Sequence, residues 1–286
     1  MVTATIVSTS WLIKTLFVFL QTTKQTRIAL NMFTFRTIAM EVVIVFLLVL
    51  SIVSMMLSLD QASPQSITGI GLAILLSATL PTYAFFIEPL VRLRGSNLTD
   101  ITSDYSHLPP IRDNNIRIVE TKSDLLNAYA TGIIPYSRTI ILGKRIRQQM
   151  TTNELESILY HEIGHLSKNH LLKLYLINLL VIGLGVVSFT FIRQAIENSS
   201  LPLLWVGLHG SAFAALLLFL SAAAQRSFEK QADVFAACAT GSMAIIDALK
   251  KMDHLSGGQV SRKSLNYPTL QQRESYVKAN VVSHTC

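Results

Sequence analysis

Four long apolar stretches constrain what this chain can fold into more than any other feature. They run over about residues 39–59, 67–91, 172–192 and 201–224. Each is long enough to cross the roughly 30 Å of hydrocarbon in a bilayer. One such stretch could form a buried core helix, but four, paired by short polar loops in a chain that is 50% hydrophobic and only 14% charged, exclude an ordinary soluble domain. The sequence therefore predicts a mainly α-helical, multi-pass membrane protein with four transmembrane helices.

The lysines and arginines near the ends of these stretches predict their orientation, because cytoplasmic loops are enriched in both residues. The loop at 60–66 contains neither, and the loop after residue 192 contains only Arg193. The other flanks are basic, with Lys14, Lys24, Arg27, Arg36, Arg92, Arg94, Arg226 and Lys230. We therefore expect the polar regions 92–171 and 225–286 to lie together on the cytoplasmic side, and the membrane to be the plasma membrane.

This arrangement predicts five segments. The basic N-terminal segment contains an apolar run that Lys14 interrupts, so we expect an interfacial helix there rather than a fifth span. Two transmembrane hairpins alternate with the two parts of one polar domain. The segments are 1–38 (N-terminal), 39–91 (hairpin), 92–171 (first polar part), 172–224 (hairpin) and 225–286 (second polar part).

Residues 161–165 read H-E-x-x-H in a segment that is expected to be helical. Asn153 can cap the start of this helix. Apolar residues then recur at helical spacing, at Leu155, Leu159 and Ile163. Positions four apart share one helix face, so His161 and His165 can bind one zinc ion together, and Glu162 can act as general base on a water at that ion. The alternative is a chance match on an ordinary helix.

A zinc site of this type needs a third protein ligand. Glu229 and Asp233 are four residues apart at the start of a further helical run and share a face. One carboxylate can bind the ion, and the other can accept the N–H of a ligating histidine and fix its tautomer. The alternative is a solvated charged face beside a membrane segment.

Two further histidines are interpreted as structural. His170 lies nine residues after His161, which would place it on the opposite face of a continuing helix, so we expect a surface or capping residue there. His209 lies inside the fourth apolar stretch, where a polar side chain is costly, and we expect it to hydrogen-bond a neighbouring helix.

Several of these elements together resemble a known family. They are N-A-Y-A-T-G at 127–132, the apolar strand T-I-I-L-G at 139–143, the helix at 153–165 that ends in H-E-x-x-H, and F-E-K-Q-A-D at 228–233. Over roughly residues 120–280 the chain resembles the integral-membrane zinc metallopeptidases that include bacterial HtpX and the type I CAAX prenyl proteases, and it is more similar to the HtpX-like members. The resemblance implies a gluzincin-type α+β peptidase domain with a small sheet beside the active helix. It also implies one Zn²⁺ per chain, with Glu229 as the third ligand.

The late part of the chain departs from the family pattern. Tyr267 stands where the family usually has a histidine before a proline, whereas Pro268 and Arg273 are kept. Arg273 can stabilise the oxyanion of a tetrahedral intermediate or brace the site, and Tyr267 can donate a hydrogen bond to the same oxyanion. The alternative for Arg273 is a surface charge.

A substrate-binding strand is expected from the segment between residues 116 and 132, which is typical of short strands. An edge strand beside the zinc can bind an extended peptide through its backbone, and we expect Asn127 and Ala128 to take part. The alternative for Asn127 is a turn residue that satisfies its own backbone.

The residues and the resemblance together predict a membrane-embedded zinc endopeptidase that cleaves peptide bonds at the cytoplasmic face, in quality control of membrane proteins. Two alternatives stay open: processing of prenylated C-termini, and a non-catalytic zinc-binding signalling protein. The expected partners are protein or peptide substrates, membrane proteins among them, and the lipid bilayer. No nucleic acid is expected, because the chain has no basic run with interleaved aromatics. The sequence makes no prediction about oligomeric state.

Overall fold

The computed structural model describes residues 98–113, 115–122, 124–241, 243–258, 260–261, 265 and 267–283, together with 74–75, 78–79, 81–82 and 85. The predicted interfacial helix at 1–38, and the first predicted hairpin at 39–91 apart from those few positions, lie outside the described residues. The chain divides into two compact units, which we describe separately. One comprises Met1–Thr82 and Asn178–Leu217, and the other comprises Tyr83–Ile177 and Leu218–Cys286.

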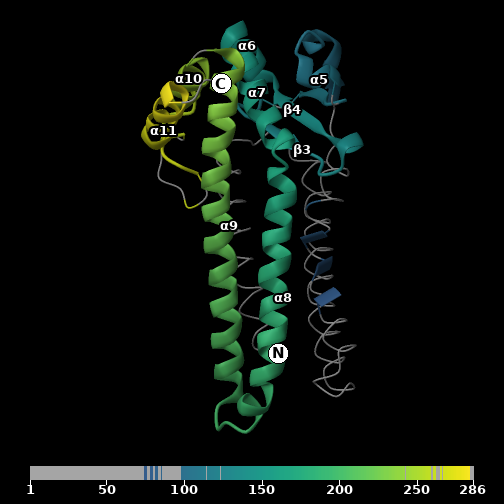
Figure 1. The fold of residues 1–286 in the computed structure, drawn as a ribbon, viewed down its shortest axis with the longest axis vertical. Coiled ribbons are helices and arrows are strands. Elements are labelled where there is room, and N and C mark those ends of the chain that lie inside the picture. The colour runs from purple at the N-terminus through teal and green to yellow at the C-terminus, as the bar shows by residue number, and fades with distance from the viewer. Residues whose placement is uncertain are drawn as a thin grey trace. The chain divides into compact units, whose positions relative to one another are not determined.

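A small mixed sheet forms part of the second unit (Figure 1). Strands β2 and β4 are parallel, with Val119 opposite Ile141, whereas β1–β2 and β3–β4 are antiparallel. Every residue of β4 is buried, which explains the unbroken apolar character of this strand. Strand β3 pairs with β4 alone among the described residues, so it forms an edge. The strands, in the spatial order β1-β2-β4-β3, are β1 (Leu98–Asp100), β2 (Arg117–Thr121), β4 (Thr139–Gly143) and β3 (Ala128–Thr131).

Short helices connect the strands to one another and to the helix that follows the sheet in the sequence. The predicted small sheet beside a mostly helical remainder is therefore present, although its strand order could not be read from the sequence. The connecting elements are the 3-10 helices η2 (Thr102–Tyr105) and η3 (Pro135–Ser137) and the helices α5 (Pro109–Asp113) and α6 (Lys144–Gln149).

The helix that carries H-E-x-x-H is α7 (Thr152–Ser167). Its N-cap is Thr151, not Asn153 as the sequence predicted. The hydroxyl of Thr151 accepts the N–H of Glu154, and the carboxylate of Glu154 accepts the N–H of Thr151, which completes a capping box. Asn153 is exposed in the first turn. The prediction failed because three neighbouring residues can all cap a helix, and both Thr151 and Asn153 have a glutamate three positions later, so the local pattern does not decide between them.

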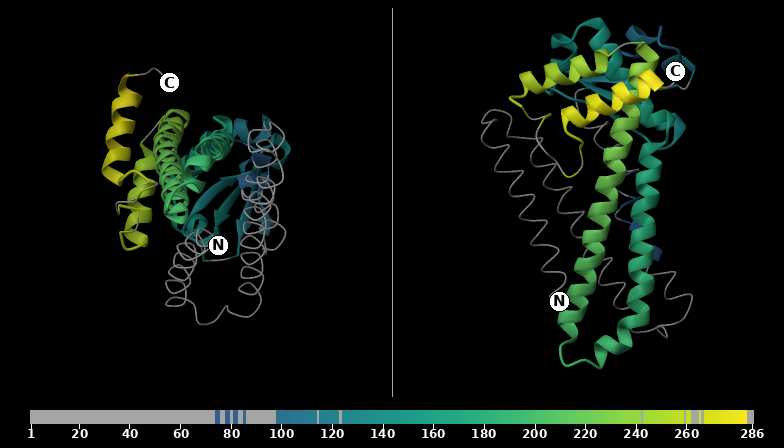
Figure 2. Two further views of the ribbon diagram at one scale, coloured as in Figure 1. Left: turned by 90° about the horizontal axis from the view of Figure 1, so that it is seen from below. Right: turned by 60° about the vertical axis from the view of Figure 1, so that its left-hand side comes forward.

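Helix α7 contacts both the sheet and the C-terminal helices, so it lies at the centre of the second unit. It contacts β3 and β4 on one side and α10 (Ala244–Leu255) on the other, and α10 contacts α11 (Leu270–Ser283). Figures 1 and 2 show the sheet and the two C-terminal helices on opposite sides of α7. The predicted apolar face is buried in the core between them, at Leu155, Leu159 and Ile163.

Two long helices follow, α8 (His170–Glu197) and α9 (Pro202–Thr240). By length and composition, His170–Arg193 and Leu204–Thr240 are long and apolar enough to cross a membrane. The third and fourth predicted spans fall within these helices. Helix α9 does not end near residue 224 with its apolar stretch, but continues without a break through Glu229 and Asp233.

Within the first unit, α8 and α9 pack closely where a glycine leaves space. A Cβ atom added at Gly185 would lie 3.2 Å from the ring of Phe213. Close by, Ser188 Oγ lies 2.9 Å from His209 Nε2. The prediction that His209 hydrogen-bonds a neighbouring helix is therefore confirmed.

Candidate metal centre

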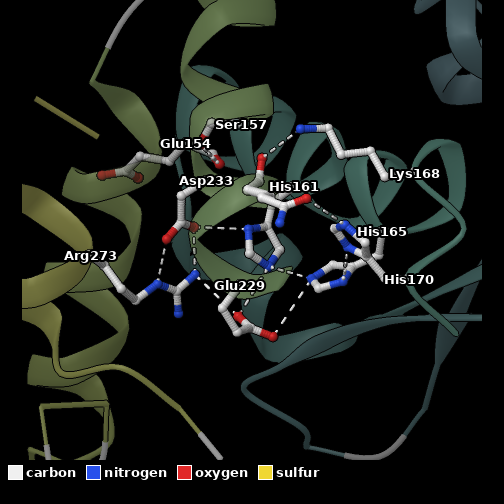
Figure 3. Close-up of polar contacts among 10 residues, drawn as sticks. Glu154, Ser157, His161, His165, Lys168, His170, Glu229, Asp233 and Arg273 are labelled. Atoms are coloured by element: carbon white, nitrogen blue, oxygen red, sulfur yellow. Dashed lines mark hydrogen bonds and ion pairs between the residues drawn. The ribbon is translucent and has the colours of Figure 1, made fainter. Parts of the chain in front are cut away.

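Three side chains from two helices converge in the second unit (Figure 3). His161 and His165 lie one turn apart on α7, and Glu229 reaches them from α9. One ligand atom from each lies within 4.8 Å of the other two. His161 Nε2 is 3.2 Å from His165 Nε2 and 3.5 Å from Glu229 Oε2, and His165 Nε2 is 3.6 Å from Glu229 Oε1. The three residues that the sequence predicted as metal ligands are thus brought together.

These distances fit a zinc ion. A tetrahedral ion with bonds of about 2.0–2.1 Å holds its ligand atoms about 3.3–3.4 Å apart, close to the three separations in this site. The donor set of two imidazoles and one carboxylate is also one that zinc prefers.

The charge of the site favours a cation as well. Burial opposes a positive charge on His161, yet Asp233 and Glu229 raise its pKa to about 10.

A carboxylate and a guanidinium support His161 on the Nδ1 side of its ring. His161 Nδ1 lies 2.9 Å from Asp233 Oδ1, and the side chain of Asp233 is completely buried. Arg273, on α11, donates Nε to Asp233 Oδ2 at 2.6 Å and a second N–H to Oδ1. The second guanidinium nitrogen also lies 3.4 Å from Glu229 Oε2. Of the two roles expected for Arg273, this geometry favours bracing.

His170 is not the surface residue that the sequence suggested. Only 2% of it is exposed, and its Nδ1 lies 3.1 Å from Nδ1 of His165. The prediction failed because it extended α7 beyond its real end. The helix ends at Ser167, Asn169 adopts a left-handed conformation with φ of 54°, and a separate helix, α8, begins at His170. The signal that could have revealed this break is the K-N pair at 168–169, because asparagine tolerates positive φ.

Glu162 directly follows His161, one of the three candidate ligand residues, and is buried. Burial raises the pKa of its carboxyl to about 7, and the charge of Glu229 acts in the same direction. The neighbouring His161, the backbone N–H of Ala130 and Arg273 act in the opposite direction. The contact with Ala130 places the carboxylate of Glu162 directly against edge strand β3. A carboxyl group whose pKa lies near neutral pH is suited to taking up and releasing a proton.

The remaining predicted residues are Asn127 and Ala128, at the start of edge strand β3, and Tyr267, which precedes α11. Asn127 is exposed and precedes β3, and its backbone oxygen accepts the N–H of Gly143 at 3.0 Å. Ala128 is buried opposite Leu142. Tyr267 is 53% exposed, and partial burial together with the charges of Glu229 and Glu162 raises the pKa of its phenol.

Comparison with known proteins agrees with this site. Residues 99–255, more than half of the chain, match the sequence model of peptidase family M48. The chain belongs to peptidase family M48. An M48 relative, the protease HtpX homolog of Bacteroides fragilis (strain YCH46), is 30% identical over 79 residues, which cover 28% of this chain and 24% of that protein. The predicted resemblance to HtpX-like membrane metalloproteases is thereby confirmed.

The fold of this M48 protein is also found in a solved structure. The crystal structure of S. mikatae Ste24p superimposes with a TM-score of 0.57 at 20% identity, over 79% of this chain and 61% of that one. The chain thus spans about a quarter of the curated relative and less than two thirds of Ste24p. The likeness to Ste24p extends beyond the residues matched to the M48 family and indicates a common fold.

Proposed function

We propose that this M48 protein is a zinc-dependent endopeptidase that cleaves protein substrates at the cytoplasmic face of the membrane. The observation that carries the proposal is the near-tetrahedral spacing of His161, His165 and Glu229, with the buried carboxylate of Glu162 beside them. This constellation has the parts that metal-assisted peptide hydrolysis needs: three ligands and a base.

In this proposal each residue has a defined task. His161, His165 and Glu229 hold one Zn²⁺, which when bound lowers the pKa of a water and polarises the scissile carbonyl. Glu162 takes the proton of the attacking water on its carboxylate and passes it to the leaving amine. Asp233 keeps the proton of His161 on Nδ1, so that Nε2 faces the centre. Arg273 holds Asp233 in place.

Edge strand β3 supplies a place for the substrate. Its N–H and C=O groups on the side away from β4 can pair with an extended peptide. The contact between Ala130 and Glu162 puts the base next to that edge, so a peptide bound there would present its backbone to the centre. We assign Asn127 and Ala128 to substrate binding because Ala128 begins this strand and Asn127 directly precedes it.

Topology and substrate class follow from the charge pattern and the span number. Basic flanks at Arg92, Arg94, Arg226 and Lys230 support a cytoplasmic location for both parts of the polar domain. Four spans, of which α8 and α9 contain the third and fourth, suit a compact enzyme without a large membrane chamber. We therefore propose quality control of membrane proteins rather than processing of prenylated C-termini, and the plasma membrane as its location.

The test compares the wild type, Glu162→Gln and the control Glu156→Gln, all purified in detergent. Glu156 lies on the same helix, partly exposed and paired with His107. Bound zinc and cleavage of an unfolded protein are measured for each. We expect zinc in all three, with cleavage reduced roughly 10²–10⁴-fold in Glu162→Gln only. Wild-type cleavage by Glu162→Gln, or no zinc in the wild type, would overturn the proposal. Cleavage of a farnesylated peptide but not of its unlipidated copy would assign the enzyme to C-terminal processing.

A further inference from the structure

We propose that His170 is a positioning residue that holds the ligand His165 in its zinc-binding tautomer, through a one-way chain of hydrogen bonds to Gln231 and Ser227. This inference rests on the proposed zinc site. It concerns a residue to which neither the H-E-x-x-H pattern nor the E-x-x-A-D pattern assigns a role. It is carried by four contacts, among side chains that range from buried His170 to exposed Ser227.

The first link fixes the proton of His165. Its Nε2 faces His161 Nε2 and Glu229, at 3.2 and 3.6 Å. A nitrogen that binds a metal carries no proton, so in the zinc-binding tautomer the proton of His165 sits on Nδ1. That nitrogen lies 3.1 Å from Nδ1 of His170. His165 must therefore donate, and His170 must accept.

Two further hydrogen bonds fit a His170 that accepts the proton of His165 on its Nδ1. With its Nδ1 accepting, neutral His170 carries its own proton on Nε2, which lies 3.3 Å from the side-chain oxygen of Gln231. The amide nitrogen of Gln231 then donates to Ser227 Oγ at 3.1 Å. Each donor meets an acceptor in a single direction, from partly buried His165 to Ser227 at the surface. In the other neutral tautomer, His170 would carry its proton on Nδ1, and this proton would point at the proton on Nδ1 of His165.

Packing fixes the plane of the His170 ring. The ring stacks on Phe228 with centroids 4.4 Å apart and an interplanar angle of 7°. Phe228 precedes Glu229, and Gln231 follows it by two positions, so one segment of α9 supplies the third ligand, the stacking ring and the acceptor for His170. Helix α9 thus contacts His165 directly through Glu229 and orients it indirectly through His170.

The two ligand histidines have chemically different supports. Asp233 supports His161 with a negative charge, whereas His170 offers His165 a neutral acceptor. Glu162, Glu229 and Asp233 already place three carboxyl groups around the centre. A fourth carboxylate at this position would add charge repulsion among buried groups, and a neutral imidazole avoids it.

Two substitutions separate hydrogen bonding from packing. His170→Phe keeps a planar ring to stack on Phe228 but removes the acceptor. His170→Asn loses the ring but keeps an acceptor, because Oδ1 of asparagine is bonded to Cγ as Nδ1 of histidine is. His107→Phe serves as a control at an exposed histidine. Zinc affinity is measured by competition with a chromophoric chelator, and the unfolding temperature of each metal-free protein is recorded.

We expect His170→Phe to bind zinc about 10–100-fold more weakly than the wild type, with an unchanged metal-free unfolding temperature. His170→Asn should bind zinc more tightly than His170→Phe, and His107→Phe should bind like the wild type. Nitrogen NMR of histidine-labelled protein should show His165 protonated on Nδ1 in the wild type. Unchanged affinity in His170→Phe, or equal losses in both variants with a lowered metal-free unfolding temperature, would overturn the inference. A wild type that binds no zinc would instead overturn the proposed function.

Discussion

Arg273 holds Asp233 by two hydrogen bonds, from Nε to Oδ2 at 2.6 Å and from a terminal nitrogen to Oδ1, and both side chains are buried. The pair joins α11 to α9. Because Asp233 Oδ1 also lies 2.9 Å from His161 Nδ1, the last described helix of the chain is connected to the centre through one carboxylate.

Removing Arg273 should destabilise the fold as well as the site. Arg273→Ala leaves the carboxylate of Asp233 buried without its partner, and breaking a buried pair in this way costs about 3–5 kcal/mol. Arg273→Lys keeps the charge but not the two-pronged geometry, so its loss should be intermediate. Arg112→Ala is the control, because Arg112 pairs with Asp113 at the surface and should contribute at most about 1 kcal/mol. Detergent-solubilised variants are compared by chemical denaturation. Equal stability of Arg273→Ala and Arg112→Ala would contradict the bracing role.

The capping box of α7 should make stability depend on pH. Burial alone would raise the pKa of Glu154, but hydrogen bonds from Lys251 Nζ and from the Thr151 N–H and hydroxyl outweigh it, and the pKa is lowered overall from 4.5. A carboxyl with a depressed folded pKa stabilises the protein above its unfolded pKa. This stability is lost as the pH falls through the folded pKa.

Glu154→Gln should therefore lower the free energy of unfolding by about 1 kcal/mol at neutral pH. The difference from the wild type should shrink as the medium is acidified through the folded pKa of Glu154. Thermal unfolding of both proteins over a series of pH values tests this. A difference that stays constant from neutral to acid pH would rule out ionised Glu154 as its source.

Metal removal should abolish hydrolysis and lower thermal stability together. A ligand that binds only the folded state stabilises it by about 4 kcal/mol when its free concentration is 1,000 times its Kd. Dialysis against a chelator should lower the unfolding temperature, and added zinc should restore both this temperature and cleavage. His161→Ala, which removes one predicted ligand, should show little or no response to zinc. A chelated wild type that keeps its full unfolding temperature and activity would contradict the metal site.

Gly143, at the end of β4, should not tolerate a side chain. A Cβ atom there would lie 2.1 Å from the backbone oxygen of Leu125, in the segment that leads to Asn127 and edge strand β3. We expect Gly143→Ala to cost about 1–3 kcal/mol, as overpacking does, and to raise KM if β3 binds substrate. Gly183→Ala is the control, because among the described residues no atom outside the neighbouring backbone of its own helix lies within 4 Å of the added Cβ, and alanine favours a helix. Equal stability of the two variants would show that the strand end can shift freely.

Local patterns predicted the parts of this protein that depend on neighbours in the sequence. The spacing of Leu155, Leu159 and Ile163 predicted α7 and its buried face, and the spacing of His161 and His165 predicted that their rings would meet. Glu229 could be assigned as the ligand, in preference to Asp233, only through the family resemblance, because helical spacing treats the two carboxylates alike.

Features set by the three-dimensional fold escaped prediction. The pairing of Arg273 with Asp233 joins residues 40 positions apart, and no local pattern encodes it. His170 was misplaced because an angular position on a helix has meaning only while the helix continues, and α7 ends before it. The strand order β1-β2-β4-β3 depends on long-range pairing in the same way.

The order of the ligands along the chain has a consequence for biogenesis. All of α8 and most of α9 lie between His165 and Glu229. A ribosome-bound chain that ends before Glu229 holds two imidazoles and the base, but not the third ligand. Because the intervening residues comprise α8 and most of α9, the proposed site can form only after that whole stretch has been synthesised. Under the proposed function, a nascent chain that stops before Glu229 would therefore not hydrolyse peptide bonds.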